Sequence, residues 1–149
     1  MTNEEFDKLL NLTKYFTQDN IQLPYVGEAN IFDVAAYQSN EKFFLDVDRR
    51  SRIELKIKIQ TRYAITKIPL VRIDINSAPH RNPDGTKTSR NHIHIYRDMP
   101  NNLGNLPWAY DLETFEPFTD SITSMDFMQI FYSFCRYCNI ETYNIQGVI

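Results

Sequence analysis

The sequence predicts an α+β fold, an antiparallel sheet of about five strands with an N-terminal and a C-terminal helix packed on it. Three observations lead to this prediction. The chain begins with a capped amphipathic segment, continues with short segments rich in β-branched and aromatic residues, and ends with apolar residues at helical spacing. Because 149 residues is a common size for one folding unit, we predict a single domain over residues 1–149.

The first helix is predicted to begin after Thr2. Thr2 and Glu5 have the spacing of a capping box, in which the Thr2 side chain accepts from the Glu5 amide and the Glu5 carboxylate accepts from the Thr2 amide. Phe6, Leu9 and Phe16 then fall on one apolar face. We therefore expect about four turns of amphipathic helix.

The middle of the chain is predicted to form an antiparallel meander. The clearest strand pattern is Ile53 to Ile59, where odd positions are apolar and even positions are charged, as in a half-buried strand. The long segment from Ser77 to Arg90 is rich in turn residues and is predicted to be a loop. The predicted strands cover about residues 30–38, 42–48, 52–63, 69–76 and 91–97.

The last third of the chain is predicted to close the core with a helix. An irregular stretch, residues 98–118, comes first, and we expect Trp108 and Tyr110 to hold it against the rest of the fold. A short strand from Ile140 to Ile145 is expected after the helix. The helix is predicted from about Ser124, because the following apolar residues have helical spacing: Phe127, Ile130, Phe131, Phe134 and Cys138.

The composition favours a protein of a reducing cytoplasm. No apolar run approaches the roughly 18 residues of a membrane span, and the first residues are polar and acidic, so neither a membrane helix nor a signal peptide is expected. Cys135 and Cys138 are the only cysteines. Because they fall within the aromatic C-terminal helix, we interpret them as buried core residues and not as a redox pair or half of a zinc site.

The charges are unevenly distributed along the chain. Residues 42–97 carry thirteen basic and five acidic groups, whereas both ends are acidic. The acidic ends can either cover the basic sheet or form a separate acidic face, which would suit competition with nucleic acid for a basic groove on another protein. Direct nucleic-acid binding is not expected, because no known motif is present, and Arg49 to Arg52 is interpreted as a charged hairpin tip.

The three histidines of the chain are clustered. His92 and His94 form an H-x-H pair, and on a strand this pair places both imidazoles on one face, roughly 6 to 7 Å apart. His80 lies in the loop before that strand. We predict that His80, His92 and His94 bind one zinc ion, with Asp74 or Asp84 as a fourth ligand or as an orienting carboxylate.

Several motifs resemble those of an uncharacterised family of small proteins, found mostly in phages and prophages of Gram-positive bacteria. The resemblance runs over much of the chain, and it implies a phage accessory protein, a class in which anti-CRISPR proteins are prominent. The motifs that carry it are Pro79-His80, Asn82-Pro83-Asp84-Gly85, His92-Ile93-His94-Ile95-Tyr96 and Trp108-Ala109-Tyr110.

Two functions are therefore expected from the sequence. The first is a non-enzymatic, metal-stabilised phage protein of the host cytoplasm that binds and inhibits a host defence complex, as an anti-CRISPR protein with Cas9 as the candidate target. The alternative is a zinc-dependent hydrolase acting on nucleotides or nucleic acid, in which three histidines leave one zinc position open to activate water.

Overall fold

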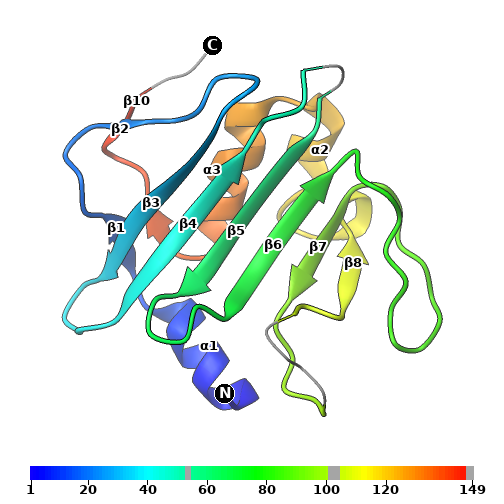
Figure 1. Cartoon of the computed structure of the whole chain (residues 1–149), viewed down its shortest axis with the longest axis horizontal. Coiled ribbons are helices and arrows are strands. Elements are labelled where there is room, and N and C mark those ends of the chain that lie inside the picture. The colour runs from blue at the N-terminus through cyan, green and yellow to red at the C-terminus, as the bar shows by residue number, and fades with distance from the viewer. Residues whose placement is uncertain (53–54, 101–104, 147–149) are drawn as a thin grey trace.

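A large, mostly antiparallel β-sheet forms the centre of the molecule, as Figure 1 shows for the computed structural model. The structure describes residues 1–52, 55–100 and 105–146. Eight strands follow the order β8-β7-β6-β5-β4-β3-β1-β9, and β2 and β10 pair separately. The strands are β1 Lys14–Phe16, β2 Ile21–Gln22, β3 Ala29–Ala36, β4 Lys42–Asp48, β5 Ile57–Tyr63, β6 Pro69–Ile75, β7 His92–Ile95, β8 Ala109–Asp111, β9 Ile140–Glu141 and β10 Ile145–Gln146.

The helices lie at both ends of the chain, as predicted. Helix α1 spans Asn3–Asn11, α2 spans Thr119–Ser124 and α3 spans Phe127–Tyr137, with a short 3-10 helix at Leu112–Thr114. The α+β class is thus confirmed, but the main sheet has eight strands where about five were predicted. The additional strands have only two or three residues, which is too short for a periodic pattern. None of the helices in the described ranges is long and apolar enough to cross a membrane.

Helix α1 begins as predicted and ends earlier. The Thr2 side chain accepts a hydrogen bond from the Glu5 amide at 3.0 Å. The helix stops at Asn11, and Phe16 lies in β1, where its backbone pairs with β3. Phe16 was included in the predicted helical face because its spacing from Leu9 fits a helix. An apolar residue at this position is equally compatible with a buried position in a strand.

Three other elements differ from the prediction. Strand β5 begins at Ile57, and the residues Ile53 and Glu54 of the predicted strand lie outside the described residues. The helix predicted from about Ser124 is α3, and the preceding helix α2 was not predicted; Met125, in a left-handed conformation with φ of 51°, separates the two. The strand predicted from Ile140 to Ile145 is replaced by the separate short strands β9 and β10.

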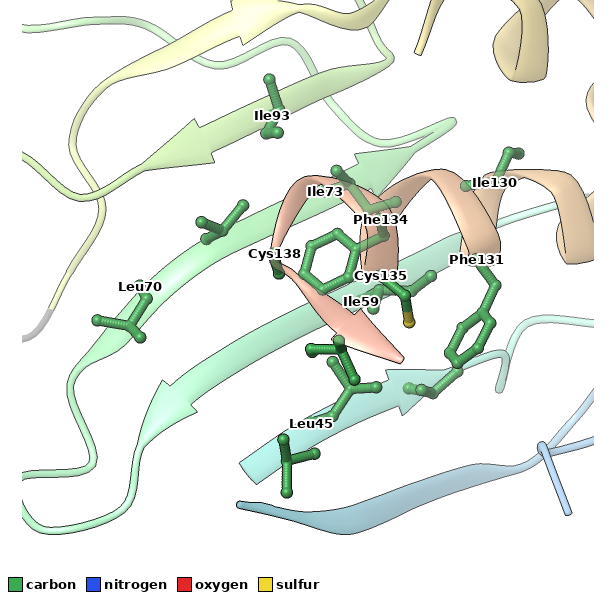
Figure 2. Packing of buried hydrophobic residues seen from close by; sticks show 14 of the residues in the cluster. Leu45, Ile59, Leu70, Ile73, Ile93, Ile130, Phe131, Phe134, Cys135 and Cys138 are labelled. Carbon is green, nitrogen blue, oxygen red and sulfur yellow. The ribbon is translucent and has the colours of Figure 1, made fainter. Parts of the chain in front are cut away.

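One face of the sheet carries the hydrophobic core. Along most of the central strands, buried apolar residues alternate with polar ones, so that Leu45 and Val47 of β4, and Ile57 and Ile59 of β5, point to the same side. Helices α2 and α3 lie on that side (Figure 1). Figure 2 shows side chains of α3 against the strands, and both cysteines are buried there as predicted. The labelled residues are Leu45, Ile59, Leu70, Ile73, Ile93, Ile130, Phe131, Phe134, Cys135 and Cys138.

The basic residues of the middle segment have varied surroundings. Arg49 is only 7% exposed, with its guanidinium 3.9 Å from the centre of the Phe127 ring, so the interpretation of Arg49 to Arg52 as a charged hairpin tip is wrong for Arg49. On the polar face of the sheet, Arg50 pairs with Asp48 at 2.7 Å and Arg62 pairs with Asp46 at 2.7 Å. These acidic partners come from the middle segment itself and not from the acidic ends.

Lys14 connects the ends of two helices. Its side chain is buried, and Nζ donates to the carbonyl oxygens of Leu10 at 2.9 Å, Leu12 at 2.9 Å and Cys138 at 2.8 Å. Burial lowers the pKa of Lys14 to about 8, against the opposing effect of Cys138, so the ammonium form persists at neutral pH. All three N–H groups of the ammonium are therefore used to join the end of α1 to the end of α3.

We expect the Lys14→Met substitution to lower the free energy of unfolding by about 3 kcal/mol, because three carbonyl groups lose their donor and each such loss costs about 1 kcal/mol or more. Urea denaturation measures the effect. The control is Lys8→Met, which removes an exposed ammonium of α1 and should change stability by less than about 0.5 kcal/mol. Equal stability of the two variants would contradict the role given to Lys14.

Candidate metal centre

The pairing of β6 with β7 brings four polar side chains together. Asp74 lies opposite His92, and Arg72 lies opposite His94. Residues at i and i+2 of a strand share a face, and in both strands the intervening isoleucines point into the core. All four side chains therefore project from the face of the sheet opposite the helices.

Asp74, His92 and His94 have the spacing of metal ligands. The Nε2 atoms of His92 and His94 lie 3.3 Å and 3.2 Å from the same Asp74 Oδ2. All three residues are buried, and their ligand atoms lie within 4.8 Å of one another. In a tetrahedral zinc site with bonds of 2.0 to 2.1 Å, neighbouring ligand atoms are about 3.3 Å apart. The group can hold a metal ion without moving its ligand atoms far.

The hydrogen bonds of the two imidazoles leave Nε2 available as a ligand. His92 Nδ1 lies 3.0 Å from the Ser89 carbonyl oxygen, and His94 Nδ1 lies 2.8 Å from the Leu106 carbonyl oxygen. Since a carbonyl oxygen can only accept, Nδ1 carries the proton in each ring, and a neutral ring then has its lone pair on Nε2. Metal-binding histidines are commonly oriented in this way by a carbonyl or carboxylate.

In the neutral form of the two rings, acceptor atoms face one another, and a cation would resolve this conflict. With the proton on Nδ1, the Nε2 lone pairs of His92 and His94 both face the Asp74 carboxylate, which is itself an acceptor. Burial lowers the pKa of His94, against the opposing effect of Asp74, and so disfavours the imidazolium form. A divalent metal between the lone pairs and the carboxylate would turn this repulsion into coordination.

The Asp74 carboxylate is ionised although it is buried. Burial acts to raise the pKa of Asp74, but this pKa is held well below its usual range, and the positive charge of Arg72 is a cause that needs no proton on either Nε2. Within the described part of the chain, Oδ1 of Asp74 has no hydrogen-bond partner. A buried carboxylate oxygen without a partner is costly, and a bound cation would satisfy it.

Arg72 approaches the same ligand atoms as a metal would. Its Nη2 lies 3.0 Å from His94 Nε2 and 3.1 Å from Asp74 Oδ2. Because a guanidinium only donates, this contact also requires His94 Nε2 to be unprotonated. The side chain of Arg72 is 28% exposed, so it has room to turn away from the ligands. Arg72 is therefore the cation with which a metal competes.

His80, predicted as the third ligand, lies beside the group. Its ring centre is 4.6 Å from that of His94 and 6.1 Å from that of His92. Its Nε2 lies 2.7 Å from the Pro107 carbonyl oxygen, to which it donates, so Nδ1 is the basic nitrogen of this ring. Among the described residues, the group of three whose ligand atoms lie close enough to share one ion contains Asp74 and not His80.

The loop from Ser77 to Arg90 is held by hydrogen bonds. The Asn82 side chain is buried, with Nδ2 donating to the Ala109 carbonyl at 3.0 Å and Oδ1 accepting from the Ala109 amide at 2.8 Å. Thr88 and His80 pair through their backbones, and the turn at Gly85 has a positive φ of 90°. These hydrogen bonds hold the loop without a metal ion. Asp84, the other predicted carboxylate, is exposed and accepts from Thr86 within the turn.

The metal group forms part of the wall of a cavity of about 480 Å³. His80 lines the same cavity, which lies between the 76–91 loop and strands β5 to β7. The remaining charged side chains of the wall are mostly basic. They are Asp48, Arg50, Lys56, Lys58 and Arg72.

Sequence reasoning underestimated Asp74 and missed Arg72 and the two lysines. Asp74 was only one of two candidate fourth ligands, and Lys56 and Lys58 were considered only as the polar face of a strand or part of a basic patch. A signal was present for Arg72 and Asp74, because their i, i+2 spacing matches that of the two histidines on the neighbouring predicted strand.

Comparison with known proteins identifies a family but no activity. The family of unknown function DUF6978 matches residues 1–140 of the chain. No curated protein sequence and no solved structure matches it. The resemblance to an uncharacterised family is therefore confirmed over most of the chain.

We expect the Arg72→Met substitution to strengthen Zn²⁺ binding by roughly tenfold or more, because it removes the cation that competes for two ligand atoms. Paired ions near a protein surface interact by up to ~4 kcal/mol, and about 1.4 kcal/mol corresponds to a factor of ten. Competition titration with a zinc indicator measures the affinity. Arg62→Met, which removes an arginine paired with Asp46 on the same face, is the matched control and should leave the affinity unchanged. Weaker zinc binding by the Arg72 variant would mean that Arg72 supports the ligands.

Proposed function

The chain belongs to the family of unknown function DUF6978, and we propose that it acts as a zinc-dependent hydrolase with Asp74, His92 and His94 as the metal ligands. One observation carries the proposal. The ligand atoms of the three buried side chains lie within 4.8 Å of one another, close enough to share one metal ion, and the side chains line a cavity of about 480 Å³.

The number of protein ligands favours a catalytic over a structural zinc. Structural zinc sites are closed by four protein ligands, whereas catalytic sites use three and leave a position for water or substrate. When bound in such a site, zinc lowers the pKa of water to about 7 and provides a nucleophile at neutral pH. The ligand set of this chain, one carboxylate and two imidazoles, matches the second type.

His80 has a position suited to proton transfer in this proposal. It lines the cavity, and its Nδ1 is the basic nitrogen because Nε2 donates to Pro107. A side chain that accepts a proton beside a metal-bound water is the usual complement of a hydrolytic site. We therefore assign His80 to the substrate side of the centre and Asp74 to its ligand set.

Three expectations remain predictions from the resemblance. They are the phage origin, the Gram-positive source and the inhibition of a host defence complex such as Cas9. A metal that only stabilises a binding protein would favour a closed site with four protein ligands. The open ligand set beside a cavity instead supports the hydrolase, which the sequence had placed second. Recovery of a defence protein at one-to-one stoichiometry from host extract would restore the inhibitor as the leading proposal.

Elemental analysis of tag-free protein is expected to find about one zinc per chain. Asp74→Asn and His92→Gln should each lower the zinc content strongly, since mutation at a metal centre typically costs tenfold or more in affinity. His80→Gln should retain zinc and serves as the control. Loss of zinc in the His80 variant together with retention in the Asp74 variant would restore the three-histidine site.

The same measurement tests the choice of metal. Two histidines and one carboxylate also bind Fe(II) in oxygenases. Stoichiometric iron in place of zinc would contradict the hydrolase and favour oxygen chemistry.

Zinc-loaded protein is expected to hydrolyse an ester in a panel of nucleotides, single-stranded DNA and carboxylic esters. A chelator should abolish turnover and added zinc should restore it. Asp74→Asn should lower the rate by about a hundredfold or more, while Arg62→Met should leave it unchanged. Turnover that survives in a folded Asp74 variant would reveal a contaminating enzyme and overturn the proposal.

A further inference from the structure

We propose that the cavity beside the metal centre holds a phosphate group between the ammonium groups of Lys56 and Lys58. The substrate of the hydrolase is then a small phosphate ester. The phosphate subsite stands on the cavity and its charges, whereas the assignment of a substrate rests on the proposed function.

The sheet places both lysines beside the metal ligands. Lys58 lies opposite Asp74 in the β5–β6 pair, and Asp74 lies opposite His92 in the next pair, so these three side chains form one row across the polar face. Neighbouring strands are about 4.8 Å apart, which puts Lys58 within roughly 10 Å of the histidine strand. Lys56 is two residues before Lys58, and both exposed side chains line the cavity.

The charges of the cavity favour a dianionic ligand. Arg50 is held by two contacts to Asp48, at 3.0 Å and 2.7 Å, and Arg72 contacts Asp74. No carboxylate of the described residues lies within 4.0 Å of the Lys56 or Lys58 ammonium. Lys58 lies opposite Asp48 in the β4–β5 pair, but Asp48 and Asp74 are each already paired with an arginine, so the wall carries two more basic than acidic groups. This excess of positive charge suits an anion, and phosphate is a common ligand of lysine. A neutral carboxylic ester would leave both ammonium groups without an anionic partner.

The size and lining of the cavity indicate a small ester and not a polynucleotide. A volume of about 480 Å³ is within the range of small-molecule sites. A polynucleotide needs a continuous basic track, but the next arginine along this face, Arg62, is neutralised by Asp46. The described lining residues include no Phe, Tyr or Trp on which a base could stack. Recognition is thus of the phosphate and not of a base.

The reaction that follows is hydrolysis of a phosphate ester. The oxygen of a water molecule bonds to phosphorus as the phosphorus–oxygen bond to the alcohol breaks. One proton of the water passes to His80 Nδ1 and from there to the leaving alcohol. The products are the alcohol and inorganic phosphate, and no oxidant or reductant is consumed.

Isothermal titration of the full zinc-loaded chain tests the subsite. The probes are inorganic phosphate, adenosine monophosphate and a ten-residue oligothymidylate. Wild-type protein should bind phosphate and the mononucleotide with affinities within about fivefold of each other, and the oligonucleotide no more tightly. The double variant Lys56→Ala, Lys58→Ala should bind phosphate at least about tenfold more weakly, because it removes both charged hydrogen-bond donors of the subsite.

The matched control is the double variant Lys42→Ala, Lys87→Ala, which removes the same charge from exposed sites outside the cavity. It should bind phosphate within about twofold of wild type, and all three proteins should contain equal zinc. If the Lys56, Lys58 variant retains zinc and binds phosphate at the wild-type level, the proposed phosphate subsite is wrong. The proposed metal centre is not affected by that result.

Two further outcomes test the proposed hydrolase and the small phosphate ester separately. Absence of zinc from the wild-type protein overturns the proposed hydrolase, and titration of phosphate into the zinc-free chain still tests the lysine pair. In the second outcome, the oligothymidylate binds more than tenfold tighter than the mononucleotide and loses this affinity in the Lys56, Lys58 variant. That result would overturn the proposal of a small phosphate ester as substrate and favour single-stranded nucleic acid.

Discussion

The alternation of side chains across the sheet is the constraint on which the core and the site both depend. In β6, Ile73 faces the helices while Arg72 and Asp74 face the cavity, and β7 repeats this arrangement with Ile93 between its two histidines. A shift of register by one residue would send the ligands into the core. The burial that stabilises the fold therefore also fixes the direction of the metal ligands.

The electrostatics of the site depend on a buried carboxylate among nitrogen groups. The pKa of Asp74 lies below its usual range, and the Arg72 guanidinium, 3.1 Å from Oδ2, stabilises the ionised carboxylate. An ion this deeply buried would be costly alone, and the cost is offset only if charges and hydrogen bonds complete the cluster. Arg72 completes it in part, whereas a divalent metal would satisfy the lone pairs of both histidines and the carboxylate together.

The family motifs mostly position the site. Asn82 of the loop motif forms two hydrogen bonds with Ala109 of the Trp108-Ala109-Tyr110 motif, and so connects two segments far apart in the sequence. Arg97 lies 4.2 Å from the Trp108 ring centre and donates to the Tyr110 hydroxyl. The carbonyl groups that fix the histidine tautomers come from Ser89 and Leu106, which lie in these irregular segments. The segments around these motifs therefore position the candidate metal ligands through side-chain and backbone contacts.

The sequence by itself determined the features that depend on local pattern. The capped start of α1, the half-buried strands, the shared face of His92 and His94 and the buried cysteines all follow from spacings within one element. Tertiary structure decided the rest. Pairing between distant segments determines the edge strands, the presence of Asp74 rather than His80 in the candidate ligand group, and the position of Lys58 beside that group. Short-range periodicity in the sequence contains no information on such pairing.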